Sequence, residues 1–153
     1  VKKTHPRIAF RGQLDSLEAA ILEAQALAHR QDAPDVRDDL GEVLERVRRV
    51  LGAEVKEEPL PEAALLGMDQ EEMRQASHDI RGRFGMEHPI PGWEMGELAL
   101  RINTLRTRVR EVELAAATAF EAPGEAPRPD IIRELNRLSS AVYLIFCRVV
   151  SGK

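Results

Sequence analysis

Apolar residues recur at steps of three and four along most of the chain, and no segment alternates convincingly with a period of two. Steps of three and four place side chains on one face of an α-helix, whereas alternation is typical of a β-strand. The pattern therefore predicts an all-α protein. Helices are expected at about 7–30, 35–53, 69–85 (a short one), 95–121 and 129–150.

Prolines and glycines separate these predicted helices. The first helix stops before "QDAPD", and the prolines of "EVKEEPLPEAALLG" indicate a connection after the second. Asp69 and Glu72 have the spacing of a capping box, which predicts the start of the short third helix. The segment "RFGMEHPIPGW" holds two prolines and two glycines and is too irregular to continue a helix. It is a candidate functional loop.

Each long predicted helix carries one continuous apolar stripe, the pattern of a helix that packs in a bundle. With 153 residues, the chain is expected to form a single domain, residues 1–153. The fold class that follows is an up-and-down five-helix bundle, ferritin-like in appearance. The stripe residues are Leu14, Leu17, Ile21, Ala24 and Ala28; Leu40, Val43, Val47, Val50 and Leu51; Leu98, Ile102, Leu105, Val109, Val112 and Ala116; and Ile131, Leu135, Leu138, Val142, Ile145 and Val149.

Composition and charge exclude several classes of protein. A single cysteine, Cys147, leaves no internal disulfide framework or cysteine-rich metal site, and a reducing, cytoplasmic location is expected. The 22 Lys and Arg against 26 Asp and Glu give a net charge of −4 without a long basic block, which argues against a nucleic-acid partner. No apolar run approaches the roughly 18 residues of a membrane span. The chain begins with Val1 instead of Met, so we expect that an N-terminal segment is missing.

The segment "LRTRVREVE" (105–113) places charges beside the apolar stripe of its helix. Arg106, Arg110 and Glu113 run along one edge at helical spacing. One interpretation is a solvated face on which Arg110 pairs with Glu113 and contributes little. Arg110 would then be comparable to an ordinary exposed arginine, and Arg46 is expected to be one. The other is a site for a ligand with several negative charges.

A polar line runs along the last predicted helix, next to its apolar face. Asn136, Ser139, Ser140 and Tyr143 lie at i, i+3, i+4 and i+7 and share one side. Buried amide and hydroxyl groups need hydrogen-bond partners or cost about 1–3 kcal/mol each. Either these side chains form a register-setting network between helices, or something polar faces them.

Other polar and aromatic residues have simpler interpretations. Asp15 is at the right spacing to be the i+4 partner of Arg11, and Trp93 and Phe84 flank the loop as packing anchors. No two histidines are spaced to lie on one helical face as ligands, so no protein-bound metal is expected. The histidines are His5, His29, His78 and His88.

Three segments together resemble one enzyme family. "GQLD" (12–15), "LRTRVREVE" (105–113) and "ELNRLSSAVYLI" (134–145) are similar, in this order, to segments shared by corrinoid adenosyltransferases, which move the adenosyl group of ATP onto cobalamin. The resemblance runs from about residue 5 to 152. The segments "HPRIAFRGQLDSL" and "CRVVSG" resemble the ethanolamine-utilisation type, which is related to the propanediol-utilisation type.

The resemblance implies a homo-oligomer, commonly a trimer, that binds ATP and a corrinoid where subunits meet. Arg106 and Arg110 would hold the triphosphate or complete the interface. Asp15 would pair with an arginine of another subunit, Arg106 first. Glu113 would hold Arg110 or a ribose hydroxyl, and Asn136 would contact the nucleotide. The other residues assigned to binding are Arg137 and Gly12, with Trp93 in place of the aromatic side chain beneath the corrin.

The implied reaction is displacement at the 5′ carbon of ATP by cobalt(I), with triphosphate as the leaving group. Mg²⁺ would accompany the phosphates, and a flavoprotein is the expected reductant. The propanediol type begins with a phosphate loop rich in glycine and threonine, and the ethanolamine type has an upstream His/Cys metal cluster. Neither is present in this sequence.

Two other functions stay open. In the first, the chain is a non-catalytic bundle that binds a nucleotide or corrinoid. In the second, it is a structural module in which the apolar stripes drive oligomerisation and the arginines set the register of the helices. Binding and turnover measurements separate these alternatives from the enzyme.

Overall fold

The computed structural model describes residues 5–152, and it contains helices but no β-strand within that range. The prediction of an all-α protein is confirmed. Val1, on which the expectation of a missing segment rests, lies outside the described residues. The elements are α1 (Pro6–Arg30), α2 (Pro34–Lys56), α3 (Gln70–His78), α4 (Ile80–Phe84), the 3₁₀ helix η1 (Trp93–Met95), α5 (Glu97–Phe120) and α6 (Pro129–Ser151).

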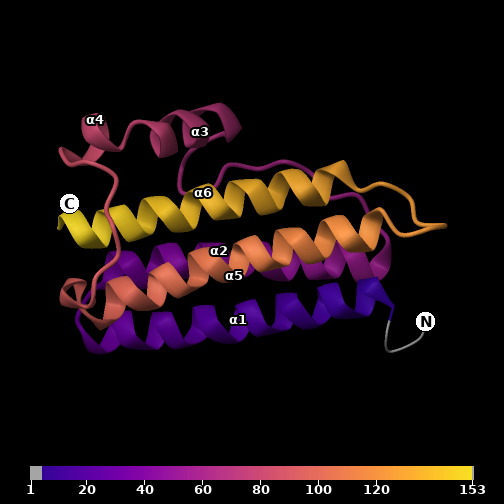
Figure 1. The fold of residues 1–153 in the computed structure, drawn as a ribbon, viewed down its shortest axis with the longest axis horizontal. Coiled ribbons are helices and arrows are strands. Elements are labelled where there is room, and N and C mark those ends of the chain that lie inside the picture. Colours follow the sequence, from indigo (N-terminus) through magenta and orange to yellow (C-terminus); the bar gives the residue numbers. More distant parts are fainter. Residues whose placement is uncertain (1–4, 153) are drawn as a thin grey trace.

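Four long helices form the bundle (Figure 1). α1 packs between α2 and α5, and α6 packs against the same two helices from the other side. Each neighbouring pair is antiparallel, whereas the diagonal pair α2 and α5 runs in one direction. A long crossover, residues 57–96, makes this possible by returning the chain to the end where α2 began. A four-helix bundle with one long crossover has the connectivity of ferritin-like folds.

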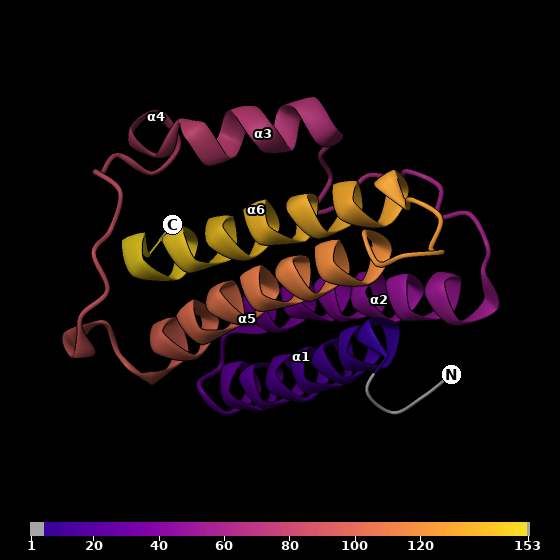
Figure 2. The ribbon, with the colours of Figure 1, turned by 45° about the vertical axis from the view of Figure 1, so that its right-hand side comes forward.

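The predicted third helix is divided in two and lies outside the bundle. Asp79 has the non-helical dihedrals φ −119° and ψ 58°, and its carboxylate accepts a hydrogen bond from Gly82 N at the start of α4. Asp69 and Glu72 form the expected capping box at the start of α3. α3 and α4 both pack on α6, on the side away from α1 (Figure 2). We call residues 70–84 the strap, because they cross the outer surface of α6.

The apolar stripes predicted from the sequence form the core. All of their residues are buried except Leu51 and Val149, which are half-buried. The ring of Phe10 on α1 meets Phe120 on α5 edge-on, with centroids 5.7 Å apart. Among residues 5–152, no helix is both long enough and apolar enough to span a bilayer.

A buried ion pair joins α2 to α6. Arg46 was expected to be exposed, but only 5% of its surface is accessible. Its Nη1 atom donates to Glu134 at 2.6 Å, and its Nη2 atom donates to the carbonyl of Ala63 at 2.8 Å. Arg137, which is also buried, donates to the carbonyls of Ala63 at 2.7 Å and Met68 at 3.0 Å. These bonds fix the connection after α2 against the bundle.

Asp130 makes the start of α6 sensitive to acid. Burial opposes its charge, but hydrogen bonds from Arg128 and from the backbone N–H groups of Leu60 and Ile131 lower the pKa of Asp130 from 3.8 to about 2. A carboxyl group whose pKa is lower in the folded state than in the unfolded state stabilises the protein at pH values above the unfolded-state pKa. This stabilisation is lost as the pH falls through the folded-state pKa. We expect protonation of Asp130 to lower the free energy of unfolding of the protein by about 2 kcal/mol between about pH 5 and pH 2.

Urea unfolding of the wild type and of Asp130→Asn across this pH range measures the effect. The amide does not titrate, so the variant should show a shallower dependence of unfolding free energy on pH. Equal slopes for the two proteins would contradict the assignment to Asp130.

Candidate functional site

A cleft of about 370 Å³ lies between α5, α6, the end of α3 and the loop that follows α4. We call it the arginine cleft. Its size falls within the range of small-molecule sites. Its lining residues are Ser77, His78, Pro89, Pro91, Arg106, Arg110, Ser139, Ser140, Tyr143 and Phe146.

The cleft brings together the two polar features that the sequence showed on separate helices. Arg106 and Arg110 enter from α5, one turn apart, and Ser139, Ser140 and Tyr143 enter from α6. Both helices direct their apolar stripes into the core, so these side chains at the edges of the stripes meet where the two helices pack together. Something polar therefore faces Ser139, Ser140 and Tyr143, as expected, whereas Asn136 of the same polar line is exposed outside the cleft.

The two arginines of the cleft are available to a ligand. Arg106 is half-buried and donates through Nε to the side chain of Asn103 at 3.1 Å. Within residues 5–152, neither Arg106 nor Arg110 forms an ion pair, so the expected pair between Arg110 and Glu113 is wrong. Burial raises the pKa of Glu113, and the charge of Arg110 opposes this rise. Two guanidinium groups without counter-ions attract an anion.

The hydroxyl groups on α6 divide into two kinds. Ser139 and Ser140 have no hydrogen-bond partner among the described residues, so a network between bundle helices is not formed there. The Tyr143 hydroxyl lies 2.5 Å from Nδ1 of His88, and the two rings stack with centroids 5.7 Å apart. Burial, together with the neighbouring Cys147 thiol, raises the pKa of Tyr143 to about 12. This hydroxyl therefore stays neutral at physiological pH.

Three predicted binding residues lie outside the cleft. Asn136 is exposed one turn before Ser139 and donates only to the carbonyl of Ile132, at 3.3 Å. Trp93 is 82% exposed on η1. Arg137 is buried and its Nη atoms bind backbone carbonyls of the connection after α2, which favours a structural role over a contact with a nucleotide.

Asp15 and Gly12 also lie away from the cleft, on the exposed surface of α1. The interpretation of Asp15 as a partner of Arg11 is wrong, because Arg11 Nε donates to the buried Glu54 at 2.6 Å. Asp15 forms no ion pair within the described chain. Its pairing with Arg106 of another subunit stays a prediction, since the structure contains one chain.

The sequence did not single out the strap residues that complete the cleft, Ser77 and His78. These two residues reach the cleft only because the strap folds back over α6, and Pro89 and Pro91 enter from the loop that follows it. The two prolines marked their segment as a candidate functional loop, but no spacing signal pointed to His78. Among residues 5–152, no three His, Cys, Asp or Glu side chains cluster as a metal site.

The contact between Tyr143 and His88 should hold the loop against α6. Tyr143→Phe removes one hydrogen bond worth about 1 kcal/mol, so the hydrogen-bonded backbone amides of Arg83 and Gly85, where the loop begins, should exchange with solvent about fivefold faster. Hydrogen exchange followed by mass spectrometry measures this rate, and peptides from α1 serve as the internal control. Unchanged exchange of these two amides, or equal acceleration in α1, would contradict a local restraint.

A family model described as cobalamin adenosyltransferase matches residues 1–149. The chain belongs to this family. The resemblance inferred from the three sequence segments is therefore confirmed.

Two curated relatives share the description corrinoid adenosyltransferase EutT. The protein from Salmonella typhimurium is 35% identical over 149 residues, which cover 95% of this chain and 53% of the relative. The protein from Escherichia coli K12 is 35% identical over 146 residues, with the same shares covered. The chain thus spans about half the length of the curated relatives it matches. No solved structure matches the chain.

Proposed function

We propose that the arginine cleft binds the triphosphate of ATP. We further propose that the protein to which this chain belongs transfers the 5′-deoxyadenosyl group of ATP to cobalt(I) of a corrinoid, giving adenosylcobalamin and triphosphate. One observation carries the proposal: Arg106 and Arg110, without counter-ions, face the free hydroxyls of Ser139 and Ser140 in one cleft. Membership of the cobalamin adenosyltransferase family supports the reaction class.

The groups that line the cleft suit a polyphosphate. Guanidinium groups stay charged when water is removed, and their forked N–H groups match pairs of phosphate oxygens. The serine hydroxyls can donate to further oxygens. Mg²⁺ would arrive with the nucleotide, because it binds phosphate oxygens and retains several waters. We propose that Glu113, three residues beyond Arg110 on α5, orients Arg110 or a ribose hydroxyl once the nucleotide is bound.

The reaction requires positioning and charge stabilisation more than protein nucleophiles. Cobalt(I) supplies the electron pair that forms the bond to the 5′ carbon, and the bond from that carbon to the triphosphate oxygen breaks. Negative charge accumulates on the leaving triphosphate, where Arg106 and Arg110 stabilise it. The neutral Tyr143 hydroxyl at the wall of the cleft adds no repulsion. Holding both reactants in line lowers the entropic part of the barrier.

The predicted residues outside the cleft fit an assembly of several copies. We propose a homo-oligomer, as a trimer, in which exposed Asp15 pairs with Arg106 of a neighbouring subunit. Gly12 and Asn136, also exposed, would approach the nucleotide bound there. Exposed Trp93 would pack beneath the corrin ring. A flavoprotein reductant and a cytoplasmic location complete the proposal.

Calorimetric titration followed by a turnover assay tests the proposed function. The chain is titrated with ATP and Mg²⁺ and with cobalamin, and adenosylcobalamin is then measured after reduction of the cobalt. Saturable binding of both substrates with product is the expected result. Binding without product would indicate the non-catalytic binding bundle, and binding of neither substrate would indicate the structural module.

A further inference from the structure

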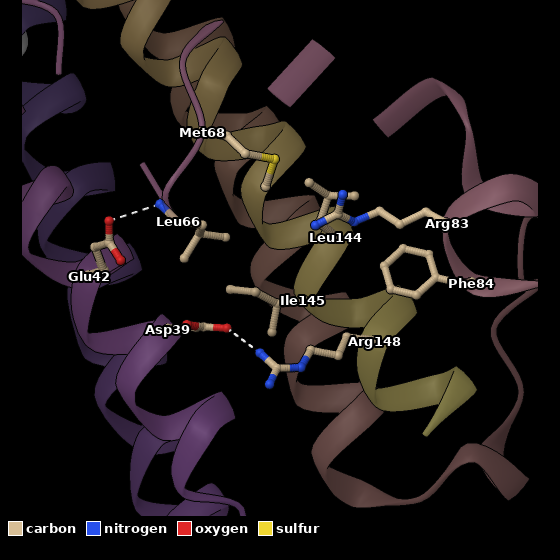
Figure 3. A pocket seen from close by; sticks show the side chains of 9 residues that line it. All are labelled: Asp39, Glu42, Leu66, Met68, Arg83, Phe84, Leu144, Ile145 and Arg148. Carbon is tan, nitrogen blue, oxygen red and sulfur yellow. Dashed lines mark hydrogen bonds and ion pairs between the residues drawn. The ribbon is translucent and has the colours of Figure 1, made fainter. Parts of the chain in front are cut away.

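A second cleft, of about 500 Å³, lies between α2, α6, α4 and the turn at residues 65–68 (Figure 3). Different α6 residues line the two clefts: Leu144, Ile145 and Arg148 here, but Ser139, Ser140, Tyr143 and Phe146 in the arginine cleft. The volume is that of a small-molecule site, and such sites combine an apolar surface with a few polar groups. The apolar lining residues are Leu66, Met68, Phe84, Leu144 and Ile145.

The carboxylates of this cleft already have partners. Asp39 accepts a hydrogen bond from Nη1 of Arg148 at 2.6 Å, and Glu42 accepts one from the backbone N–H of Leu66 at 2.8 Å. Figure 3 shows both bonds along the α2 side of the cleft. The charge of Arg148 is balanced in turn, since it also contacts Asp35 at 3.2 Å. On this wall Asp39 is paired with a cation, whereas Glu42 is held by a backbone N–H group and forms no ion pair among the described residues.

Arg83 is different from the other charged residues of the cleft. It extends from α4 toward the middle of the cleft (Figure 3). Within residues 5–152, its guanidinium forms no hydrogen bond or ion pair, and its central carbon lies over the ring of Phe84, 5.9 Å from the centroid. The cleft thus combines an apolar floor with a cation that lacks a counter-ion.

We propose that this second cleft binds an amphipathic organic monoanion. Its carboxylate or sulfonate group contacts Arg83, and its hydrocarbon part covers the apolar floor formed by Leu66, Met68 and Leu144. Charge limits the ligand to one negative group, because Glu42 on the opposite wall, which no cation of the described chain pairs with, repels a second. Polyphosphates therefore favour the arginine cleft. The proposal does not depend on the adenosyltransferase function.

Fluorescence titration of the chain with anilinonaphthalene sulfonate, a monoanion with an aromatic body, tests this site. Octanoate serves as the competitor, because it is also an amphipathic monoanion but has a carboxylate and an aliphatic chain in place of the sulfonate and aromatic rings of the probe. We expect saturable binding that octanoate displaces and ATP does not. Arg83→Ala should weaken it about tenfold or more, because a charge-assisted contact is lost. Arg83 is exposed, so its replacement should leave the fold intact, which circular dichroism verifies.

Two matched variants locate the bound probe. Arg74→Ala removes an exposed arginine of α3 that lines neither cleft and should change the affinity less than twofold. Arg110→Ala should also leave the affinity unchanged. Loss of binding in Arg110→Ala with retention in Arg83→Ala would place the probe in the arginine cleft and overturn the proposal. Absence of saturable binding, or equal affinity in Arg83→Ala and wild type, would overturn it as well.

Discussion

Arg110→Ala is expected to lower kcat/KM for ATP about thirtyfold, equivalent to about 2 kcal/mol of transition-state stabilisation. Charge-assisted hydrogen bonds contribute about 1.5–3 kcal/mol, and Arg110 forms no hydrogen bond or ion pair within residues 5–152 that would share this loss. The folded state should change little, because the side chain is exposed. Adenosylcobalamin formation at varied ATP concentration measures the effect.

The matched control for Arg110→Ala is Arg74→Ala, which removes the same charge from an exposed helical position outside both clefts. Arg46 is unsuitable, because it is buried against Glu134. Arg110→Lys keeps the charge but loses the forked geometry and should recover part of the activity. Equal losses in Arg110→Ala and Arg74→Ala would show that the effect comes from net charge and would remove Arg110 from the site.

Glu134→Ala is expected to lower the free energy of unfolding by about 3 kcal/mol. The substitution leaves the guanidinium of Arg46 buried without its carboxylate, and breaking a buried pair on one side typically costs about 3–5 kcal/mol. The carbonyl of Ala63 still accepts from Arg46, so we expect the lower end of this range. Urea denaturation followed by circular dichroism measures the change.

Glu62→Ala is the matched control for Glu134→Ala. Glu62 also pairs with an arginine, Arg133, at 3.1 Å, but its side chain is 56% exposed. Solvent screens such a pair, so its loss should cost less than about 1 kcal/mol. If the two variants were equally stable, the ion pair between Arg46 and Glu134 would not hold the bundle as the structure indicates.

Helical periodicity alone was enough to predict the all-α class, the apolar stripe of each long helix and the polar residues that lie beside that stripe. Leu105, Val109 and Val112 are buried as expected, and Arg106 and Arg110 lie at the edge of the same stripe. Such predictions succeed because the face that a residue occupies follows from its spacing within one helix. The capping box at Asp69 succeeded for the same reason, since its hydrogen bonds join residues three positions apart.

Partners distant in the sequence could not be read from local spacing. Arg11 and Arg46 found carboxylates on other helices, Glu54 and Glu134, whereas Arg110 left its i+3 neighbour Glu113 unpaired. The same limit applies to the strap, whose break at Asp79 and position on α6 brought His78 to the arginine cleft.

The sequence by itself determined which residues share a helical face and, through three short segments, the family to which the chain belongs. Only the tertiary structure decided that the arginines of α5 and the hydroxyls of α6 open into one cleft, and that Arg83 lines another. The physical reason is that helical periodicity arises from bonds between near neighbours. Ion pairs and clefts depend instead on how separate helices pack, and on which charged groups that packing removes from water.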